Sequence, residues 1–214
     1  MTDLLVTDGD GSSGTLVLAH GAGGAMDSAA MNEAAAAIAS RGIRVVRFEF
    51  GYMAGRRDGV RRPPPRAETL MGEYRDAVAQ VASDGPVIIG GKSMGGRVAS
   101  MIADELHAAG TIAGLVCLGY PFHPIAKPEQ LRTAHLATLV TPALIVQGTR
   151  DAFGSRDEVA TYSLSSSIEM LWLEDGDHSL RPRKGVSGFS YAQHLETMAD
   201  AVAGFTTRVL RQAG

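Results

Sequence analysis

The sequence has very little cysteine. Cys117 is the only one among 214 residues, so the chain cannot form an internal disulfide. Chains without disulfides are typical of reducing compartments, and we expect a cytoplasmic protein. The first residues also lack the basic and then apolar pattern of a signal peptide, and no segment approaches the roughly 20 apolar residues of a membrane span. We therefore expect no membrane partner.

An excess of one charge is also missing. The chain has 20 basic and 23 acidic residues, which gives a net charge of −3. Proteins that coat nucleic acid carry a large basic excess, so a nucleic-acid partner is not expected. The sequence contains no HExxH motif, no cysteine cluster and no dinucleotide-binding glycine pattern. We therefore expect no metal and no cofactor.

What the sequence does have is enough apolar material for a core. Hydrophobic residues make up 45% of the chain. A chain of this size buries about 70% of its extended surface on folding and needs no disulfide or metal to hold it together. No internal repeat and no long Gly, Ser or Pro linker interrupts it, and Pro63-Pro64-Pro65 reads as a loop. We predict a single domain over residues 1–214.

Short apolar runs alternate with longer segments of helical period, which indicates an α/β fold. Several runs are apolar on both faces, as strands of a parallel sheet are. The expected strands are Leu16–Ala19, Val45–Val46, Val87–Ile89, Leu115–Leu118, Ala143–Val146 and Met170–Leu173. Helices are expected over residues 28–41, 70–81, 98–106 and 191–209, the first ended by Gly42 and the last begun by Ser190.

The most informative segment runs from Val87 to Arg97 and places a G-x-S-x-G motif around Ser93, between a predicted strand and a predicted helix. In that context the flanking glycines allow a tight turn that exposes the serine hydroxyl above the sheet. Gly91-Lys92-Ser93 also resembles the end of a phosphate-binding loop. That motif requires a glycine where Pro86 stands, so we exclude it. Ser93 is the candidate nucleophile.

A serine needs a base to take its proton, and the base needs an acceptor that orients it. Asp151 follows the strand that ends at Val146, and His178 follows the strand that ends at Leu173. The order Ser93, Asp151, His178 is that of the α/β-hydrolase arrangement. Asp175 and Asp177 are rival acids, but they lie on the same loop as His178, which suits turn formation better. We predict Asp151 as the acid.

A fourth element, His20-Gly21-Ala22-Gly23-Gly24, directly follows the first predicted strand. Its glycines let the backbone approach an anionic oxygen, so the amides of Ala22 and Met94 are the candidate oxyanion hole. His20 is expected to anchor this loop rather than transfer protons. His123 either faces the pocket or packs its own loop, and the sequence does not decide between them. Cys117 reads as a small core residue.

The segments HGAGG, GGKSMGGR, GYPFHP, QGTRDAFG and GDHSL together resemble an α/β-hydrolase of the compact kind related to dienelactone hydrolases. More closely, they are similar to the hydrolase-like family that includes the testis-expressed hydrolase-like protein and the third subunit of the non-specific-lethal chromatin complex. The resemblance implies an α/β-hydrolase fold with a mostly parallel sheet of about six to seven strands, helices on both faces and no separate cap domain.

The resemblance also implies a function. Ser93, Asp151 and His178 match the family's nucleophile, acid and base, so we expect a serine hydrolase that cleaves a carboxylic ester or thioester through an acyl-enzyme. No substrate follows from the resemblance, because the family is poorly defined biochemically. The alternative, suggested by the chromatin branch, is a hydrolase-fold interaction module with little or no turnover. The sequence does not give the oligomeric state.

The expected partner is a small acyl substrate, and basic residues suggest that it is anionic. They lie on the loop after Val45–Val46, after His178 and beside the nucleophile: Arg56, Arg57, Arg61, Arg62 and Arg66, offset by Asp58, then Arg181, Arg183 and Lys184, and finally Lys92. One interpretation is a solvated rim that keeps the loops soluble. The other is a field that attracts an anionic substrate.

Overall fold

Seven strands form one sheet in the order β1-β3-β2-β4-β5-β6-β7. The computed structural model describes residues 3–9, 13–57, 59–60, 62–82 and 85–213. All neighbouring strands are parallel except β1, which pairs with β3 in the antiparallel direction. The strands are β1 Leu4–Thr7, β2 Thr15–Ala19, β3 Arg44–Phe48, β4 Val87–Lys92, β5 Ile112–Leu118, β6 Ala143–Gly148 and β7 Ile168–Leu173.

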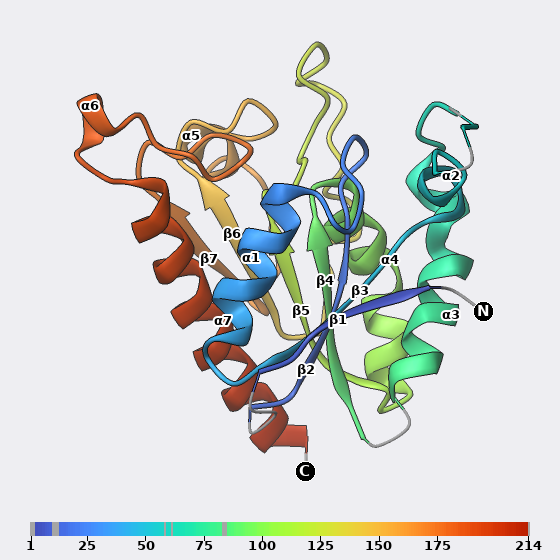
Figure 1. Cartoon of the computed structure of the whole chain (residues 1–214). Coiled ribbons are helices and arrows are strands. Elements are labelled where there is room, and N and C mark those ends of the chain that lie inside the picture. The colour runs from blue at the N-terminus through green and yellow to red at the C-terminus, as the bar shows by residue number, and fades with distance from the viewer. Residues whose placement is uncertain (1–2, 10–12, 58, 61, 83–84, 214) are drawn as a thin grey trace.

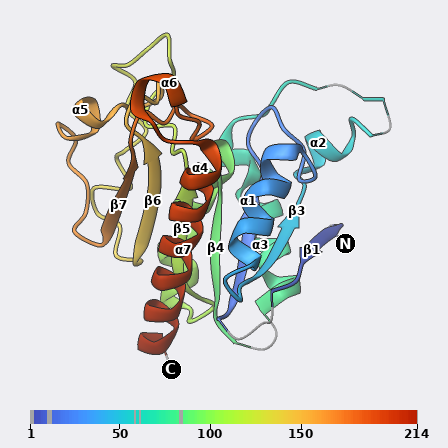
Figure 2. The ribbon, with the colours of Figure 1, turned by 60° about the vertical axis from the view of Figure 1, so that its left-hand side comes forward.

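Four longer helices cover the sheet, two on each face (Figures 1 and 2). α1 and α7 pack against one face, and α3 and α4 pack against the other. Their bounds are α1 Ala29–Ala39, α3 Met71–Val81, α4 Met94–Ala108 and α7 Tyr191–Ala213. The shorter helices are α2 Gly51–Ala54, η1 Ala67–Leu70, α5 Arg156–Val159 and α6 Lys184–Ser187. Each sheet face is thus buried under its own apolar cluster.

The predicted α/β fold with a mostly parallel sheet and covered faces is confirmed, and the described residues include no separate cap domain. The six predicted strands all form, several of them longer than expected. α1 ends at Ala39, slightly before the predicted end, and Gly42 then takes a φ of 84° that reverses the chain. Ser190 caps α7 as expected, because its Oγ accepts from the amide of Gln193 at 3.3 Å.

The strand that the sequence did not indicate is β1. It has only four residues, Leu4 to Thr7, and it lies at the edge of the sheet, half-buried or exposed throughout. Its three apolar residues are too few to distinguish an edge strand from a loop in the sequence. Figure 1 shows the short helices α2, α5 and α6 gathered at the end of the sheet where the parallel strands finish. Among the described helices, none has both the length and the apolar character needed to cross a membrane.

Candidate active site

Ser93 lies at the turn between β4 and α4 with φ 51° and ψ −116°, a backbone conformation that residues other than glycine rarely adopt. The neighbouring glycines make this turn sterically feasible. A Cβ on Gly91 would collide with the backbone of Gly95, and a Cβ on Gly95 would lie 2.6 Å from the carbonyl oxygen of Ala19. Because β4, α4 and the end of β2 approach so closely, the serine side chain is directed away from them.

The hydroxyl of Ser93 meets His178, which comes from the loop after β7. The distance from Ser93 Oγ to His178 Nε2 is 2.8 Å, and the distance from His178 Nδ1 to Asp151 Oδ2 is also 2.8 Å. The carboxylate accepts, so Nδ1 carries the ring proton and Nε2 is left to accept the proton of the serine. The structure therefore brings the three predicted residues together in a geometry suited to proton transfer.

Asp151 is fully buried and both of its oxygens are held. Oδ2 also accepts from Gln147 Nε2 at 2.9 Å, and Oδ1 accepts from the amide of Phe153 at 2.8 Å. Gln147 Oε1 in turn accepts from the amide of Tyr120 at 2.7 Å. Sequence reasoning missed Gln147, because a polar residue near the end of an apolar strand is common and its partner cannot be inferred from the pattern. It also missed Phe153, whose ring lies 4.2 Å from that of His178, centroid to centroid.

The two predicted oxyanion amides border the same pocket as Ser93. Ala22 and Met94 both line it, and a Cβ on Gly21 would lie 3.6 Å from the Cβ of Ser93. Met94 is the first residue of α4, where backbone amides have no partner within the helix. Neither amide donates a hydrogen bond to any residue in the described ranges. Both are thus available to an anionic oxygen.

His20 anchors the loop of the predicted oxyanion amide of Ala22, as the sequence analysis expected. Its Nε2 accepts from the amide of Phe50 at 3.1 Å and its Nδ1 donates to the carbonyl of Gly21 at 2.7 Å. Burial lowers the pKa of His20, which keeps the ring neutral for both bonds. Tyr52 adds a bond to the carbonyl of Ala22 at 3.1 Å. Burial raises the pKa of Tyr52 to about 12, so its hydroxyl stays protonated and donates.

Four other residues considered in the sequence analysis make no hydrogen bond to the Ser93 hydroxyl or the His178 ring. His123 is buried outside the pocket lining: its Nδ1 donates to the carbonyl of Pro124, and its Nε2 lies 3.5 Å from Glu158 Oε1 on α5. Asp175 pairs with Arg183 and Arg150, and Asp177 Oδ1 accepts from the amides of Ser179 and Arg181. Neither rival acid bonds the His178 ring. Cys117 is buried in the core, as predicted.

Several of the basic residues singled out from the sequence have partners within the protein. Arg57 pairs with Glu49 and Asp27. Lys92 Nζ donates to the carbonyl of His178 at 2.8 Å, and burial lowers the pKa of this lysine. Arg62 is exposed and lines a neighbouring pocket, whereas Arg66 borders the Ser93 pocket. Asp58 and Arg61 lie outside the described residues.

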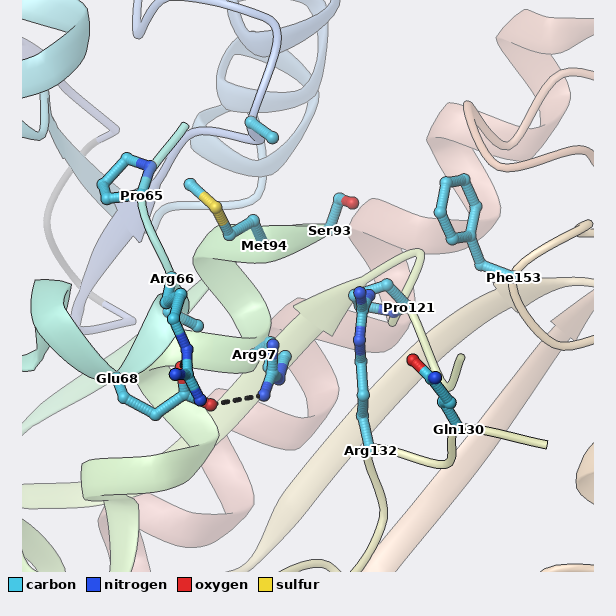
Figure 3. A pocket seen from close by; sticks show the side chains of 12 residues that line it. Pro65, Arg66, Glu68, Ser93, Met94, Arg97, Pro121, Gln130, Arg132 and Phe153 are labelled. Atoms are coloured by element: carbon cyan, nitrogen blue, oxygen red, sulfur yellow. Dashed lines mark hydrogen bonds and ion pairs between the residues drawn. The ribbon is translucent and has the colours of Figure 1, made fainter. Parts of the chain in front are cut away.

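The Ser93 pocket has a volume of about 520 Å³ (Figure 3). Its lining comes from the loops after β2, β4, β5 and β6, from the first turn of α4 and from the segment before α3: Ala22, Pro65, Arg66, Ala67, Glu68, Ser93, Met94, Arg97, Pro121, Gln130, Arg132 and Phe153. Among the described residues, no group of three or more His, Cys, Asp or Glu side chains is arranged to hold a metal ion.

Asp175 stabilises the loop that carries His178, because its carboxylate pairs with Arg183 and Arg150. Hydrogen bonds from Arg183 lower the pKa of Asp175 from 3.8 to about 2. A carboxylate with a lowered folded pKa stabilises the fold above its unfolded pKa, and this contribution disappears as the pH falls through the folded value. Asp175→Asn should lower the midpoint of thermal unfolding at pH 7, and the difference from wild type should shrink between about pH 4 and pH 2.

Thermal unfolding followed by circular dichroism across this pH range measures the effect. The matched control is Asp200→Asn, because Asp200 pairs with Arg41 through a side chain that is 66% exposed. Exposed ion pairs contribute little, so the control should unfold close to wild type at every pH. An equal and pH-independent loss in both variants would contradict the assignment.

Comparisons with known proteins agree with this fold. Residues 12–207 match the profile of a family described as an alpha/beta hydrolase domain. Among solved structures, dienelactone hydrolase from Anabaena variabilis superimposes with a TM-score of 0.72 at 18% identity, over 97% of this chain and 92% of that one. Est1E from Butyrivibrio proteoclasticus gives 0.69 at 13% identity, over 98% and 95%. A serine hydrolase without a lid from Xanthomonas campestris gives 0.60 at 16%, over 99% and 88%.

Proposed function

Because the chain belongs to the α/β-hydrolase family, we propose that it is a serine hydrolase that cleaves a carboxylic ester or thioester through an acyl-enzyme. The observation that carries the proposal is the pair of 2.8 Å contacts that join Ser93, His178 and Asp151. Ser93 is the nucleophile, His178 the base and Asp151 the acid that orients the base. The amides of Ala22 and Met94 form the oxyanion hole.

The reaction begins with proton transfer from Ser93 Oγ to His178 Nε2 as Oγ attacks the carbonyl carbon. The carbonyl oxygen gains negative charge and accepts hydrogen bonds from the two free amides, and the N-terminus of α4 adds a favourable dipole. Collapse of the tetrahedral intermediate breaks the bond to the alcohol or thiol, which leaves with the proton returned by His178. The acyl group is then bonded to Ser93 Oγ.

Deacylation uses the same groups in the same order. His178 Nε2 takes a proton from a water molecule, and the water oxygen attacks the acyl carbonyl carbon. The second intermediate collapses, the carboxylic acid leaves, and Ser93 Oγ recovers its proton. Asp151 stays ionised and stabilises the imidazolium that forms in each step. Phe153 packs against the ring and limits its movement.

A fluorophosphonate probe tests the proposal directly, because it labels a serine only when the hydroxyl is activated. Purified protein should be labelled at Ser93, as located by mass spectrometry of the peptides. Ser93→Ala should give no label, whereas Ser163→Ala should be labelled like wild type, since Ser163 is exposed and lies outside the pocket lining. Absence of labelling in wild type would overturn the proposal and favour an interaction module.

A further inference from the structure

The Ser93 pocket carries a concentrated positive charge. Its charged lining residues are Arg66, Arg97, Arg132 and Glu68, so the lining has a net charge of +2, although the chain as a whole is at −3. Glu68 is shared between two of these arginines. It lies 2.7 Å from Arg97 and 3.6 Å from Arg66. One carboxylate therefore faces three guanidinium groups.

Arg132 is the arginine without an anion. Its guanidinium has no hydrogen bond and no ion pair to any residue that the structure describes. Its backbone, in contrast, is fixed, because its amide donates to the carbonyl of Phe122 at 2.7 Å and its carbonyl accepts from Tyr120 Oη at 3.0 Å. Figure 3 shows the side chain extending from its loop toward the part of the pocket where Ser93 lies.

The surroundings of Arg132 disfavour its positive charge. Burial lowers the pKa of Arg132, and the nearby charge of Arg97 lowers it further. Arg97 itself has a buried Nε with no hydrogen-bond partner. An anionic ligand would offset the repulsion between the two guanidinium groups and satisfy their free N–H donors. Such N–H groups form a planar fork that matches the two oxygens of a carboxylate or phosphate.

We propose that Arg132, together with Arg97, binds an anionic oxygen group of the substrate, so that the preferred esters carry a carboxylate or phosphate in addition to the bond that is cleaved. This specificity rests on the proposed hydrolase function of Ser93. It assigns anion binding to Arg97 and Arg132 within the pocket instead of to Arg57 and Arg62, which are exposed on the loop after β3.

Two matched pairs of esters test the proposal at low ionic strength. In the first pair the carboxylate is on the acyl side: 4-nitrophenyl glutarate against neutral 4-nitrophenyl pentanoate. In the second it is on the leaving group: 4-acetoxybenzoate against phenyl acetate. In at least one pair, wild type should favour the anionic member in kcat/KM, on the order of 10- to 100-fold for a hydrogen-bonded charge pair. High salt should reduce the preference.

The variants compare the ratio of kcat/KM for the two members of a pair, which cancels any general loss of folded enzyme. Arg132→Gln should bring the ratio to near one, and Arg132→Lys should give an intermediate ratio, because it keeps the charge without the fork. Arg62→Gln is the matched control. Arg62 is an exposed arginine that lines the neighbouring pocket and not the Ser93 pocket, so its removal should leave the ratio at the wild-type value.

A measurement on wild type alone avoids dependence on folded variants. Glutarate and inorganic phosphate are added as inhibitors of phenyl acetate hydrolysis, and the anion that competes more strongly identifies the group the pocket takes. The proposal is overturned if neither ester pair shows an anionic preference and neither anion competes. It is also overturned if Arg132→Gln keeps the wild-type preference. Failure of the proposed function looks different, since no ester would then be hydrolysed and no fluorophosphonate label would form.

Discussion

Replacing Ser93 with alanine should reduce kcat for ester hydrolysis by roughly 10⁴- to 10⁶-fold and leave the fold intact. The loss of activity comes from the missing hydroxyl and not from a change in the fold. Gly91 and Gly95 already allow the tight turn, and an alanine side chain is smaller than that of serine. His178→Ala should cost about as much, since His178 Nε2 is the acceptor in contact with Ser93 Oγ among the described residues. The double variant should be scarcely worse than either single one, because the two residues act in one step.

Steady-state kinetics with 4-nitrophenyl pentanoate measures these losses, and thermal unfolding checks the fold. Ser163→Ala controls for the loss of a serine hydroxyl, and it should keep full activity because Ser163 is exposed and outside the pocket lining. Retention of more than about a tenth of the wild-type rate in Ser93→Ala would show that another group is the nucleophile.

The second large effect is expected for Asp151→Asn, with a loss of about 10⁴-fold in kcat. Asp151 Oδ2 accepts from His178 Nδ1, so an amide NH2 at that point would require the other imidazole tautomer, with its proton on Nε2. That tautomer cannot accept the serine proton. If the amide turns the other way, its NH2 meets the donating amide of Phe153 instead. Either orientation loses a buried hydrogen bond, which costs about 1–3 kcal/mol of folding free energy.

The comparison of kcat and of the urea midpoint between wild type and Asp151→Asn tests both parts of this expectation. Asp177→Asn is the control, because Asp177 lies on the His178 loop and its carboxylate accepts only from backbone amides among the hydrogen bonds of the described residues. It should lose far less activity. If the two variants lost the same activity, Asp151 would not be the residue that orients the base.

The proximity of Ser93, Asp151 and His178 could be predicted from the sequence, because it follows from one rule. In a parallel sheet the strands end at the same edge, so a serine after β4, an acid after β6 and a histidine after β7 converge there. Gln147 did not follow from that rule. Its role depends on the orientation of one polar side chain, whose Nε2 points to Asp151. The pattern of apolar and polar residues does not predict this orientation.

The charges were the least predictable part. The sequence shows a run of arginines, but it does not show that Arg57 folds back onto Glu49, a buried carboxylate at the end of a strand. The sequence pattern did not single out Arg132, because no other arginine lies in the long connection between β5 and β6. The role proposed for Arg132 depends on Arg97 and Glu68, which are distant from it in the sequence. Charge counted along a loop therefore does not predict which arginine lines the pocket.

The bonds around Tyr120 have a consequence for how such an enzyme changes its specificity. Tyr120 holds Arg132 through its hydroxyl and Gln147 through its backbone amide, and Gln147 holds Asp151. The residue proposed to select the substrate and the residue proposed to orient the base thus share one support. In laboratory evolution, exchanging side chains at the tip of the connection between β5 and β6 leaves that support in place. Grafting the whole connection from another enzyme does not, so new substrate preferences are best sought by point substitution with Tyr120 retained.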